Sequence, residues 1–342
     1  MGDTASREVR LKSRPVGIPQ ESDFELAEVR IPEPAEGQIL VRNIYMSVDP
    51  YMRGRMIDRK SYVPPFKLGK VLEGHCVGQV VKSNKGLFQK GDYVSSMLGW
   101  RECYLSEGGG LFKIDPAIAP IQAYLGVLGL PGLTAYTGLL HIGQPKEGET
   151  LFVSAAAGAV GGTACQIAKI KGLRVIGSAG SDEKVLWLKE KAGIDAAFNY
   201  RKTKSLTEEV SRHCPKGIDI YFDNVGGDHL EAALEHMNEF GRIVLCGMIS
   251  QYNATELPPG PRNLFLAISK KLTMRGFIVS DHLGLMPQFL EDMGRWVSQG
   301  RIHWKETVFE GIESSTKAFR GLFTGSNLGK MLVRLGPDPA AG

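Results

Sequence analysis

Residues 151–162 join a short apolar run to a series of small residues, and this stretch is the best suited in the chain to chemistry. The run Leu151-Phe152-Val153 is typical of a strand. It is followed by Ala156-x-Gly158-x-x-Gly161, a G-x-G-x-x-G fingerprint with Ala in the first place. Gly158 would let the backbone approach a pyrophosphate, and Gly161 would let the next helix pack closely on the strand. The helix N-terminus would offer unpaired N–H groups and a positive dipole end to the phosphates. We predict a dinucleotide-binding turn. Close packing of a strand and a helix is the other explanation for the small residues.

The end of the next predicted strand indicates which dinucleotide binds. Leu173–Ser178 leads into Ala179 and Gly180, at the place where an NAD site carries Asp or Glu for the ribose 2′-hydroxyl, about 20 residues on. No acidic residue stands there, and Lys184 follows shortly after. A missing carboxylate and a nearby cation favour an additional 2′-phosphate, and hence NADPH over NADH. The alternative for Lys184 is a solvated lysine on a helix surface.

The composition indicates a globular protein. The 342 residues are 43% hydrophobic and 23% charged, the net charge is +4, and this length allows two domains. We expect no nucleic-acid partner because no block of Lys and Arg occurs, and no membrane partner because no apolar run is long enough. The polar segment Met1–Arg14 lacks a signal-peptide core, so we expect a cytoplasmic location. The five cysteines are scattered without C-x-x-C spacing, which argues against disulfides and structural zinc.

The pattern of apolar runs predicts an α/β protein with an all-β part. Residues 24–115 alternate short apolar runs with turn residues, which is typical of β structure. From residue 150 onward strands alternate with helices, which predicts a parallel doubly wound sheet. We expect its strands at Leu151–Ser154, Leu173–Ser178, Ala196–Asn199, Ile218–Asp223, Gly241–Cys246 and Leu272–Phe277. We expect helices at Tyr124–Leu130, Thr134–Leu140, Thr163–Lys171, Glu183–Ala192, Leu206–His213, His229–Met237, Leu264–Ser269, Leu285–Gln299 and Ser314–Phe323, and a last strand at Lys330–Leu335 that returns to the β part.

Five motifs occur in an order that is typical of one family. They are Ser47-Val48-Asp49-Pro50-Tyr51-Met52-Arg53, Leu130-Pro131-Gly132-Leu133-Thr134-Ala135-Tyr136, Ala155–Gly161, Phe222-Asp223-Asn224-Val225-Gly226-Gly227 and Asn327-Leu328-Gly329-Lys330. Together they resemble the zinc-independent medium-chain dehydrogenase/reductases, and within them the prostaglandin reductase / leukotriene B4 dehydrogenase group. The resemblance spans residues 8–335.

The resemblance implies a fold and an activity. A GroES-like β domain, residues 1–122 and 302–342, would surround a Rossmann NADPH-binding domain of residues 123–301, with a cleft between them and the Rossmann sheets of two subunits meeting in a homodimer. NADPH would reduce the C=C bond of small α,β-unsaturated ketones and aldehydes. The alternatives are a quinone reductase of a sister branch and a cofactor-binding protein that has lost catalysis for a structural or RNA-binding use.

The resemblance also assigns residues to roles. Tyr252 would lie near the substrate carbonyl as the main catalytic residue, and Tyr51 would be a second catalytic tyrosine of the cleft. The cofactor-binding set would be Leu130, Thr134, Ala157, Gly158, Ala159, Val160, Gly161, Lys184, Tyr200, Asn224, Cys246, Gly247, Tyr252, Phe277, Val279 and Asn327. Simpler roles stay open for several of them: packing for Tyr200, a turn for Asn224, helix capping for Thr134, a loop position for Tyr252 and Asn327, and pocket shaping for Tyr51.

The chain departs from the zinc-dependent branch at both zinc motifs. The early segment reads Ser47-Val48-Asp49-Pro50 where that branch has a cysteine, and the later one reads Glu73-Gly74-His75-Cys76 in place of Gly-His-Glu. We therefore expect no metal. Hydride addition to the β-carbon of an enone puts negative charge on the carbonyl oxygen, so hydrogen-bond donors must stabilise it. We expect the hydroxyl of Tyr252 and the cofactor ribose hydroxyl to do so.

Overall fold

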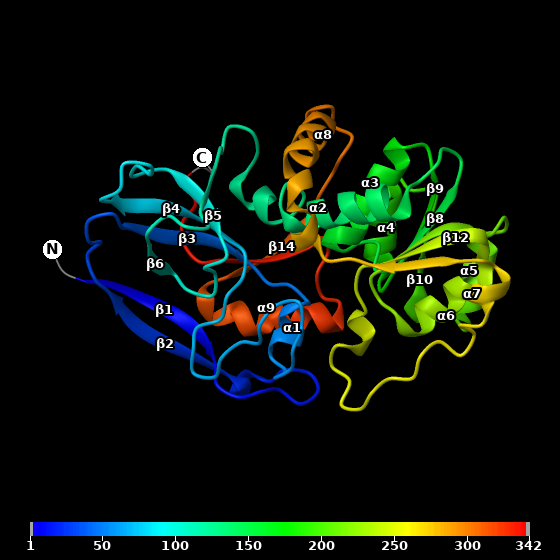
Figure 1. The fold of residues 1–342 in the computed structure, drawn as a ribbon, viewed down its shortest axis with the longest axis horizontal. Helices are drawn as coiled ribbons and strands as arrows, with labels where there is room; N and C mark the ends of the chain where they lie inside the picture. The colour runs from blue at the N-terminus through cyan, green and yellow to red at the C-terminus, as the bar shows by residue number, and fades with distance from the viewer. Residues whose placement is uncertain (1–2, 340–342) are drawn as a thin grey trace. The chain divides into compact units, whose positions relative to one another are not determined.

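The computed structural model describes residues 3–339 and separates into two compact units. Unit 1 comprises Met1–Gly126 and Glu306–Gly342, and unit 2 comprises Val127–Lys305. The domain limits expected from the sequence fall four residues before both junctions, at 122 against 126 and at 301 against 305. The expected fold class, a GroES-like β domain with a Rossmann domain, is confirmed (Figure 1).

Unit 1 is built on a seven-stranded sheet with the order β14-β15-β3-β4-β5-β7, to which β6 adds by pairing with β3. Its strands are β3 (Ile39–Ser47), β4 (Cys76–Ser83), β5 (Tyr93–Ser96), β6 (Cys103–Ser106), β7 (Phe112–Ile114), β14 (Glu306–Glu310) and β15 (Lys330–Arg334). A separate antiparallel pair is formed by β1 (Thr4–Leu11) and β2 (Phe24–Ile31). The helical segments are η1 (Glu21–Asp23), α1 (Met52–Arg55), η2 (Ile121–Leu125), η7 (Ile312–Ser314) and α9 (Ser315–Thr324). Because β15 pairs with β3, the C-terminal tail returns to the β unit as predicted.

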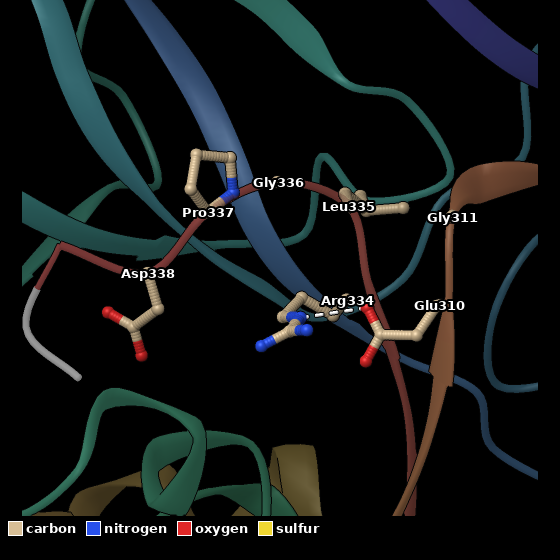
Figure 2. A pocket seen from close by; sticks show the side chains of 7 residues that line it. All are labelled: Glu310, Gly311, Arg334, Leu335, Gly336, Pro337 and Asp338. Atoms are coloured by element: carbon tan, nitrogen blue, oxygen red, sulfur yellow. Dashed lines mark hydrogen bonds and ion pairs between the residues drawn. The ribbon is translucent and has the colours of Figure 1, made fainter.

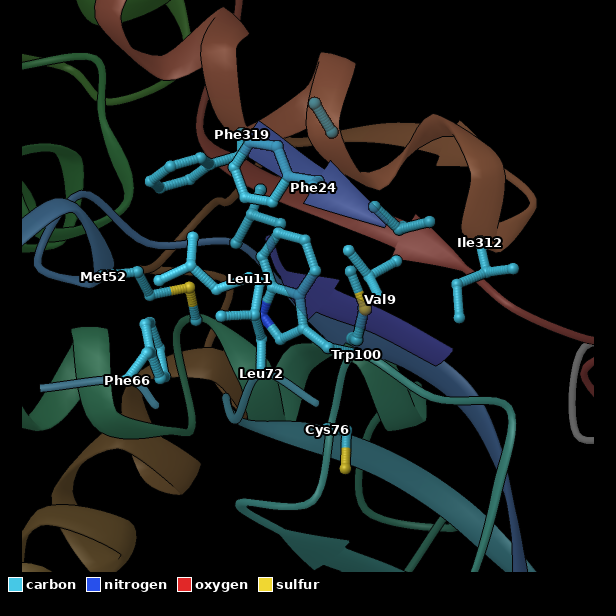
Figure 3. Close-up of a cluster of buried hydrophobic side chains, with 14 of the residues drawn as sticks. Val9, Leu11, Phe24, Met52, Phe66, Leu72, Cys76, Trp100, Ile312 and Phe319 are labelled. Atoms are coloured by element: carbon cyan, nitrogen blue, oxygen red, sulfur yellow. The ribbon is translucent and has the colours of Figure 1, made fainter. Parts of the chain in front are cut away.

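The largest core of unit 1 gathers around Trp100, which is fully buried. Its indole stacks on Phe24 with ring centroids 6.5 Å apart, and it packs in a T-shaped arrangement with Phe319 from α9 at 6.2 Å. Figure 3 shows this cluster, with Met52 from the start of α1 on one side and Ile312 on the other. The helix that begins just after Tyr51 is therefore anchored in the apolar core through Met52.

Unit 2 contains a six-stranded, entirely parallel sheet with the order β10-β9-β8-β11-β12-β13. The strands are β8 (Thr150–Val153), β9 (Arg174–Ala179), β10 (Ala196–Asn199), β11 (Ile218–Asp223), β12 (Met237–Leu245) and β13 (Thr273–Gly276). All six lie within a few residues of the predicted runs. The strand order reverses direction between β8 and β11, and ligands of such sheets bind outside the carboxyl ends of the strands at this switch point.

Helices cover both faces of this sheet. They are α2 (Leu130–Tyr136), η3 (Thr137–Gly143, a π-helix), α3 (Ala159–Ile170), α4 (Asp182–Glu190), η4 (Tyr200–Lys202), α5 (Leu206–His213), α6 (Gly227–His236), η5 (Ile249–Gln251), α7 (Leu266–Ser269), η6 (Val279–Leu285) and α8 (Met286–Ser298). The side chains of consecutive strand residues point to opposite faces of the sheet. Tyr221 packs in the cluster with α5 and α6, whereas Phe222 lies against Gly138 of η3. Among residues 3–339 no helix combines the length and apolar character needed to span a bilayer.

One predicted helix is wrong and two begin four residues earlier than predicted. Tyr124–Leu130 is not a helix, because η2 ends at Leu125 and a turn through Gly126 and Gly129 separates it from α2. Pro131 at the first turn of α2 marks the true start, where its missing N–H costs nothing. The third predicted helix begins at Ala159 rather than Thr163, so the fingerprint itself supplies the first turn of α3.

Candidate functional site

The fingerprint forms a tight turn between β8 and α3. Gly158 is the N-cap of α3, and Ala155 takes a left-handed backbone conformation with φ of 48°. A Cβ atom at Gly161 would lie 2.5 Å from the carbonyl oxygen of Ala155, so only glycine allows the helix to pack this closely. Ala157 is buried in the turn. The N–H groups of Ala159, Val160 and Gly161 belong to the first helical turn and have no intrahelical acceptor, which leaves them for a ligand at the carboxyl edge of the sheet.

A buried carboxylate fixes the neighbouring turn at the end of β11. Asp223 is fully buried, and its Oδ1 accepts the hydroxyl of Tyr221 at 2.7 Å and the N–H groups of Val225 and Gly226 at 2.9 and 2.8 Å. Burial raises the pKa of Asp223, and these donors oppose that shift. Sequence reasoning did not select Asp223, although a carboxylate that ends a buried strand is an available signal.

Asn224 joins this turn to the fingerprint turn across the switch point. Its N–H donates to Ser154 Oγ at 2.9 Å, and its side-chain Nδ2 donates to the Ser154 carbonyl at 2.8 Å. The Ser154 hydroxyl in turn donates to Asp223 Oδ1 at 3.2 Å. The predicted role of Asn224 in the turn is confirmed by these contacts. Its role toward a cofactor stays a prediction.

The loop after β12 attaches to the same edge and carries Tyr252. The N–H groups of Cys246 and Gly247 donate to the Asp223 carbonyl at 2.9 and 3.0 Å. The Tyr252 hydroxyl accepts the N–H of Met248 at 3.2 Å, and a Cβ atom at Gly247 would lie 3.1 Å from this hydroxyl. Burial raises the pKa of Tyr252 above its ordinary value and that of the Cys246 thiol to about 12, so both stay protonated at neutral pH. The turns after β8, β11 and β12 therefore form one hydrogen-bonded edge that presents a neutral phenol.

A second group of predicted residues meets around Gly180, just after β9. A Cβ atom at Gly180 would lie 3.2 Å from the Tyr200 hydroxyl and 3.3 Å from Arg201 Nε. Lys184 stands one turn into α4, whose N-cap is the hydroxyl of Ser181. Burial, and then the positive charge of Arg201, lower the pKa of Lys184. Lys184 and Tyr200 were predicted, whereas Arg201 was missed because charged residues near a strand end are usually solvated.

The remaining predicted residues of unit 2 lie on elements that pack near the fingerprint helix. α2 packs against α3, and η6 packs against α2. Thr134 lies inside α2 and donates its hydroxyl to the Leu130 carbonyl at 2.7 Å, so the alternative that it caps a helix is wrong. Phe277 lies against Gly138 of η3, and Val279 opens η6.

Tyr51 and Asn327 belong to unit 1. Tyr51 is the N-cap of α1 and packs against the core of Figure 3. Burial, and then the charge of Asp49, raise the pKa of Tyr51, so its hydroxyl is neutral. Asn327 Nδ2 donates to the Gly329 carbonyl at 2.8 Å.

A buried ion pair connects the segments that carry these two residues. Lys330 is 5% exposed, and its Nζ donates to Asp49 Oδ1 at 2.9 Å and to the Val48 carbonyl at 3.0 Å. The hydroxyl of Ser47 donates to Asp49 Oδ2. The pair spans 281 positions of sequence, and sequence reasoning did not find it.

The two zinc-motif residues of unit 1 are engaged in other contacts. His75 Nε2 lies 2.7 Å from Ser95 Oγ, and Cys76 Sγ lies 3.2 Å from Ser96 Oγ. Burial lowers the pKa of His75 to about 4 and raises that of Cys76 to about 11, so the thiol is protonated. In the described part of the chain, no group of three or more His, Cys, Asp or Glu side chains is arranged to hold a metal ion.

A surface hollow of unit 1 contains none of the predicted residues. It is lined by Glu310, Gly311 and residues 334–338, and Figure 2 shows Arg334 turned toward Glu310, with which it forms an ion pair of 2.8 Å. Its charged lining is the exposed Arg334–Glu310 pair and the carboxylate of Asp338, and we assign it no role.

Comparison with known proteins gives matches over nearly the whole chain. Residues 7–114 match the family model described as the N-terminal domain of oxidoreductase, and residues 159–298 match the model described as zinc-binding dehydrogenase. The NADPH-dependent curcumin reductase of Escherichia coli is 45% identical over 99% of this chain and 100% of its own length. The NADP(+)-dependent 2-alkenal reductase of Nicotiana tabacum is 45% identical over 97% of this chain and 98% of its own.

A solved structure agrees with the fold. The crystal structure of CurA from Vibrio vulnificus in complex with NADPH has a TM-score of 0.92 and 45% identity, covering 97% of this chain and 100% of that one. The chain therefore belongs to the medium-chain dehydrogenase/reductase family, in the group that includes the curcumin, 2-alkenal and prostaglandin reductases.

Proposed function

We propose that this protein is an NADPH-dependent reductase that acts on the C=C bond of small α,β-unsaturated ketones and aldehydes. The observation that carries the proposal is the hydrogen-bonded edge at the switch point of unit 2. There the fingerprint turn is tied through Ser154, Asn224 and Asp223 to the loop that holds Tyr252. A dinucleotide turn and a neutral hydroxyl donor thus share one edge of the sheet. The names of the relatives that match the whole chain support the same activity.

The residues of unit 2 fit NADPH in two places. The first turn of α3 offers N–H groups, and Gly161 lets this helix lie close to the sheet, as a pyrophosphate site requires. Near Gly180, Lys184 and Tyr200 would hold the 2′-phosphate. The end of strand β9, where an NAD site carries Asp or Glu, has no carboxylate here that would repel the phosphate. Leu130, Thr134, Phe277 and Val279 would line the nicotinamide. Asn224, Cys246, Gly247 and, from unit 1, Asn327 would contact the phosphates and ribose.

The chemistry assigned to this chain is stabilisation of charge on the substrate carbonyl oxygen. When bound, NADPH supplies the hydride and a ribose hydroxyl that shares this stabilisation. Tyr252 accepts the Met248 N–H through its oxygen, which leaves its own O–H to donate to the substrate. Because burial raises the pKa of Tyr252, that proton stays in place at neutral pH. Tyr51 is the second candidate donor, likewise neutral.

We propose that the reaction needs no zinc. The support is the sequence of the two zinc motifs, which has Ser47 in place of a cysteine and Glu73-Gly74-His75-Cys76 in place of Gly-His-Glu. Zinc sites in proteins use three or four ligands from Cys, His and carboxylate side chains, and among the described residues no three such side chains are arranged to hold a metal ion. The quinone reductase alternative is not favoured, because the relatives of 45% identity carry curcumin and alkenal reductase names.

The test is oxidation of NADPH by the purified, EDTA-treated protein. A medium-chain enone, the matching saturated ketone and a quinone are offered in parallel, with NADH as the control cofactor. We expect turnover of the enone alone, with the saturated ketone as the identified product. Faster turnover of the quinone would support the sister branch, and loss of activity with EDTA would overturn zinc independence.

Substituting Lys184 by Ala should weaken NADPH without affecting NADH. Removing a charge-assisted contact costs roughly 1.5–3 kcal/mol, which corresponds to roughly a 10- to 100-fold rise in KM for NADPH. Steady-state kinetics with both cofactors measure this. The matched control is Lys189→Ala, an exposed lysine of the same helix, which should change neither value. Unaltered NADPH kinetics in Lys184→Ala would contradict the 2′-phosphate assignment.

We propose a homodimer in which the β13 edges of two sheets meet. Within residues 3–339, β13 pairs with β12 and with no strand on its other side. Apolar side chains are exposed on the segments around it: Phe240 at 65%, Phe265 at 66% and Ile268 at 82%. An unpaired strand edge beside exposed apolar residues is typical of an interface. Sedimentation equilibrium at micromolar concentration should give twice the chain mass, and a monomer there would overturn the proposal.

We also propose a cytoplasmic location, which the free state of all five cysteines supports.

A further inference from the structure

We propose that Arg201 is a further specificity-determining residue, which supplies the second positive charge for the 2′-phosphate of NADPH. The inference rests on the proposed function for its cofactor. It concerns a residue that the resemblance did not select.

The position of Arg201 follows from the short helix after β10. η4 begins at Tyr200, and β10 pairs in parallel with β9, so the turns after these two strands lie at the same edge of the sheet. Both Tyr200 and Arg201 reach back over the β9–α4 turn, since the phenol oxygen and Arg201 Nε lie 3.2 and 3.3 Å from where a Cβ of Gly180 would be. The guanidinium carbon lies 6.0 Å from the centroid of the Tyr200 ring. A hydroxyl and a planar cation thus flank the same glycine.

The electrostatics of this group favour an anion. Lys184 and Arg201 interact with each other, because the charge of Arg201 disfavours the charged form of Lys184. Two acidic residues lie in the first turn of the helix that carries Lys184. Glu183 acts in the opposite sense on Lys184. Asp182 accepts Asn199 Nδ2 at 2.9 Å and forms an ion pair with Lys202. An anion placed beside both cations would remove their mutual repulsion.

The charge of the ligand requires a second cation. A phosphate monoester carries a charge of roughly −1.5 to −2 at pH 7. Lys184 supplies one positive charge as a compact ammonium, and the guanidinium of Arg201 adds a second with a planar fork that matches phosphate oxygens. Gly180 leaves room beside the Tyr200 hydroxyl and the Arg201 guanidinium, since a side chain there would contact both residues.

The experiment compares binding of 2′,5′-ADP and 5′-AMP by calorimetry, which needs no turnover. We expect Arg201→Ala to weaken 2′,5′-ADP roughly 5- to 20-fold, leave 5′-AMP unchanged and flatten the salt dependence of 2′,5′-ADP binding. Arg201→Lys should recover part of the loss, because it restores the charge without the fork. The matched control is Lys202→Ala, at the residue next to Arg201. The ammonium of Lys202 is paired with Asp182, so this variant should leave the affinities for 2′,5′-ADP and 5′-AMP unchanged.

Two outcomes would overturn the assignment of Arg201. One is an unchanged affinity of Arg201→Ala for 2′,5′-ADP, and the other is an equal loss for both nucleotides. If the unsubstituted protein itself binds both nucleotides equally, the NADPH preference in the proposed function fails, and the assignment of Arg201 falls with it. A preserved preference in Lys184→Ala and Arg201→Ala alike would place the phosphate elsewhere in unit 2.

Discussion

Replacing Tyr252 by Phe should lower kcat by roughly 10- to 100-fold while changing the affinity for NADPH little. Loss of one preorganised donor to a developing oxyanion typically costs roughly 10²–10³ in rate. The loss is smaller here because the cofactor ribose hydroxyl shares the donation. The O–H group is removed while the ring and its packing stay.

The structure explains why this hydroxyl is suited to donate. Its oxygen already accepts the Met248 N–H, which fixes the direction of the remaining O–H group. Burial raises the pKa of Tyr252 above the ordinary value near 10. A raised pKa in a phenol means that the neutral form persists to higher pH, so ionisation of Tyr252 should not lower kcat between about pH 7 and 9.

The measurement is kcat and KM at saturating NADPH for a medium-chain enone, over that pH range. The control is Tyr124→Phe, in which a tyrosine also loses one hydrogen bond, here to the Asp115 carbonyl at 3.0 Å. We expect its kcat to equal that of the unsubstituted protein. A Tyr252→Phe variant with undiminished kcat would transfer the donor role to another group, with Tyr51 the next to test.

The strands of unit 2 could be predicted because buried parallel strands are apolar runs bounded by turn residues. Ile218–Asp223 shows this best, since the predicted and observed bounds agree. Local glycine chemistry likewise placed the fingerprint turn. The predicted helix over Tyr124–Leu130 failed because Gly126 and Gly129 interrupt it, and their effect outweighs the apolar pattern.

The connections within the site could not be predicted, because they join residues far apart in sequence. Ser154 and Asn224 are 70 positions apart, and their bonds depend on β8 and β11 being neighbours at the switch point. Arg201 stands beside Lys202, and in the sequence the two cations look alike. Only the fold directs Arg201 toward Gly180 and Lys202 toward Asp182.

Substituting Lys330 by Met should destabilise the protein by at most roughly 3–5 kcal/mol, because removing the buried cation leaves the Asp49 carboxylate, whose side chain is 18% exposed, without its counter-charge. Lys330 is 5% exposed, and its ammonium is the cation held against Asp49 at 2.9 Å. After the substitution the carboxylate would keep the Ser47 hydroxyl as a donor but lose its counter-charge. The apolar Met side chain adds no donor in its place.

The free energy of unfolding, from urea titration, measures this loss. The matched control is Arg334→Ala, on the same strand β15 as Lys330. It breaks an exposed ion pair with Glu310 of β14 and should cost less than about 1 kcal/mol. The double variant Lys330→Met with Asp49→Asn should recover a substantial part of the loss, since it also removes the stranded charge. The pair is not coupled if Lys330→Met is as stable as the Arg334→Ala control. It is also not coupled if the double variant loses the sum of the effects of Lys330→Met and of Asp49→Asn, each measured alone. If the coupling is found, the Lys330–Asp49 pair holds together the two segments that carry Tyr51 and Asn327. Lys330→Met then shows what this connection contributes without any change to Tyr51 itself.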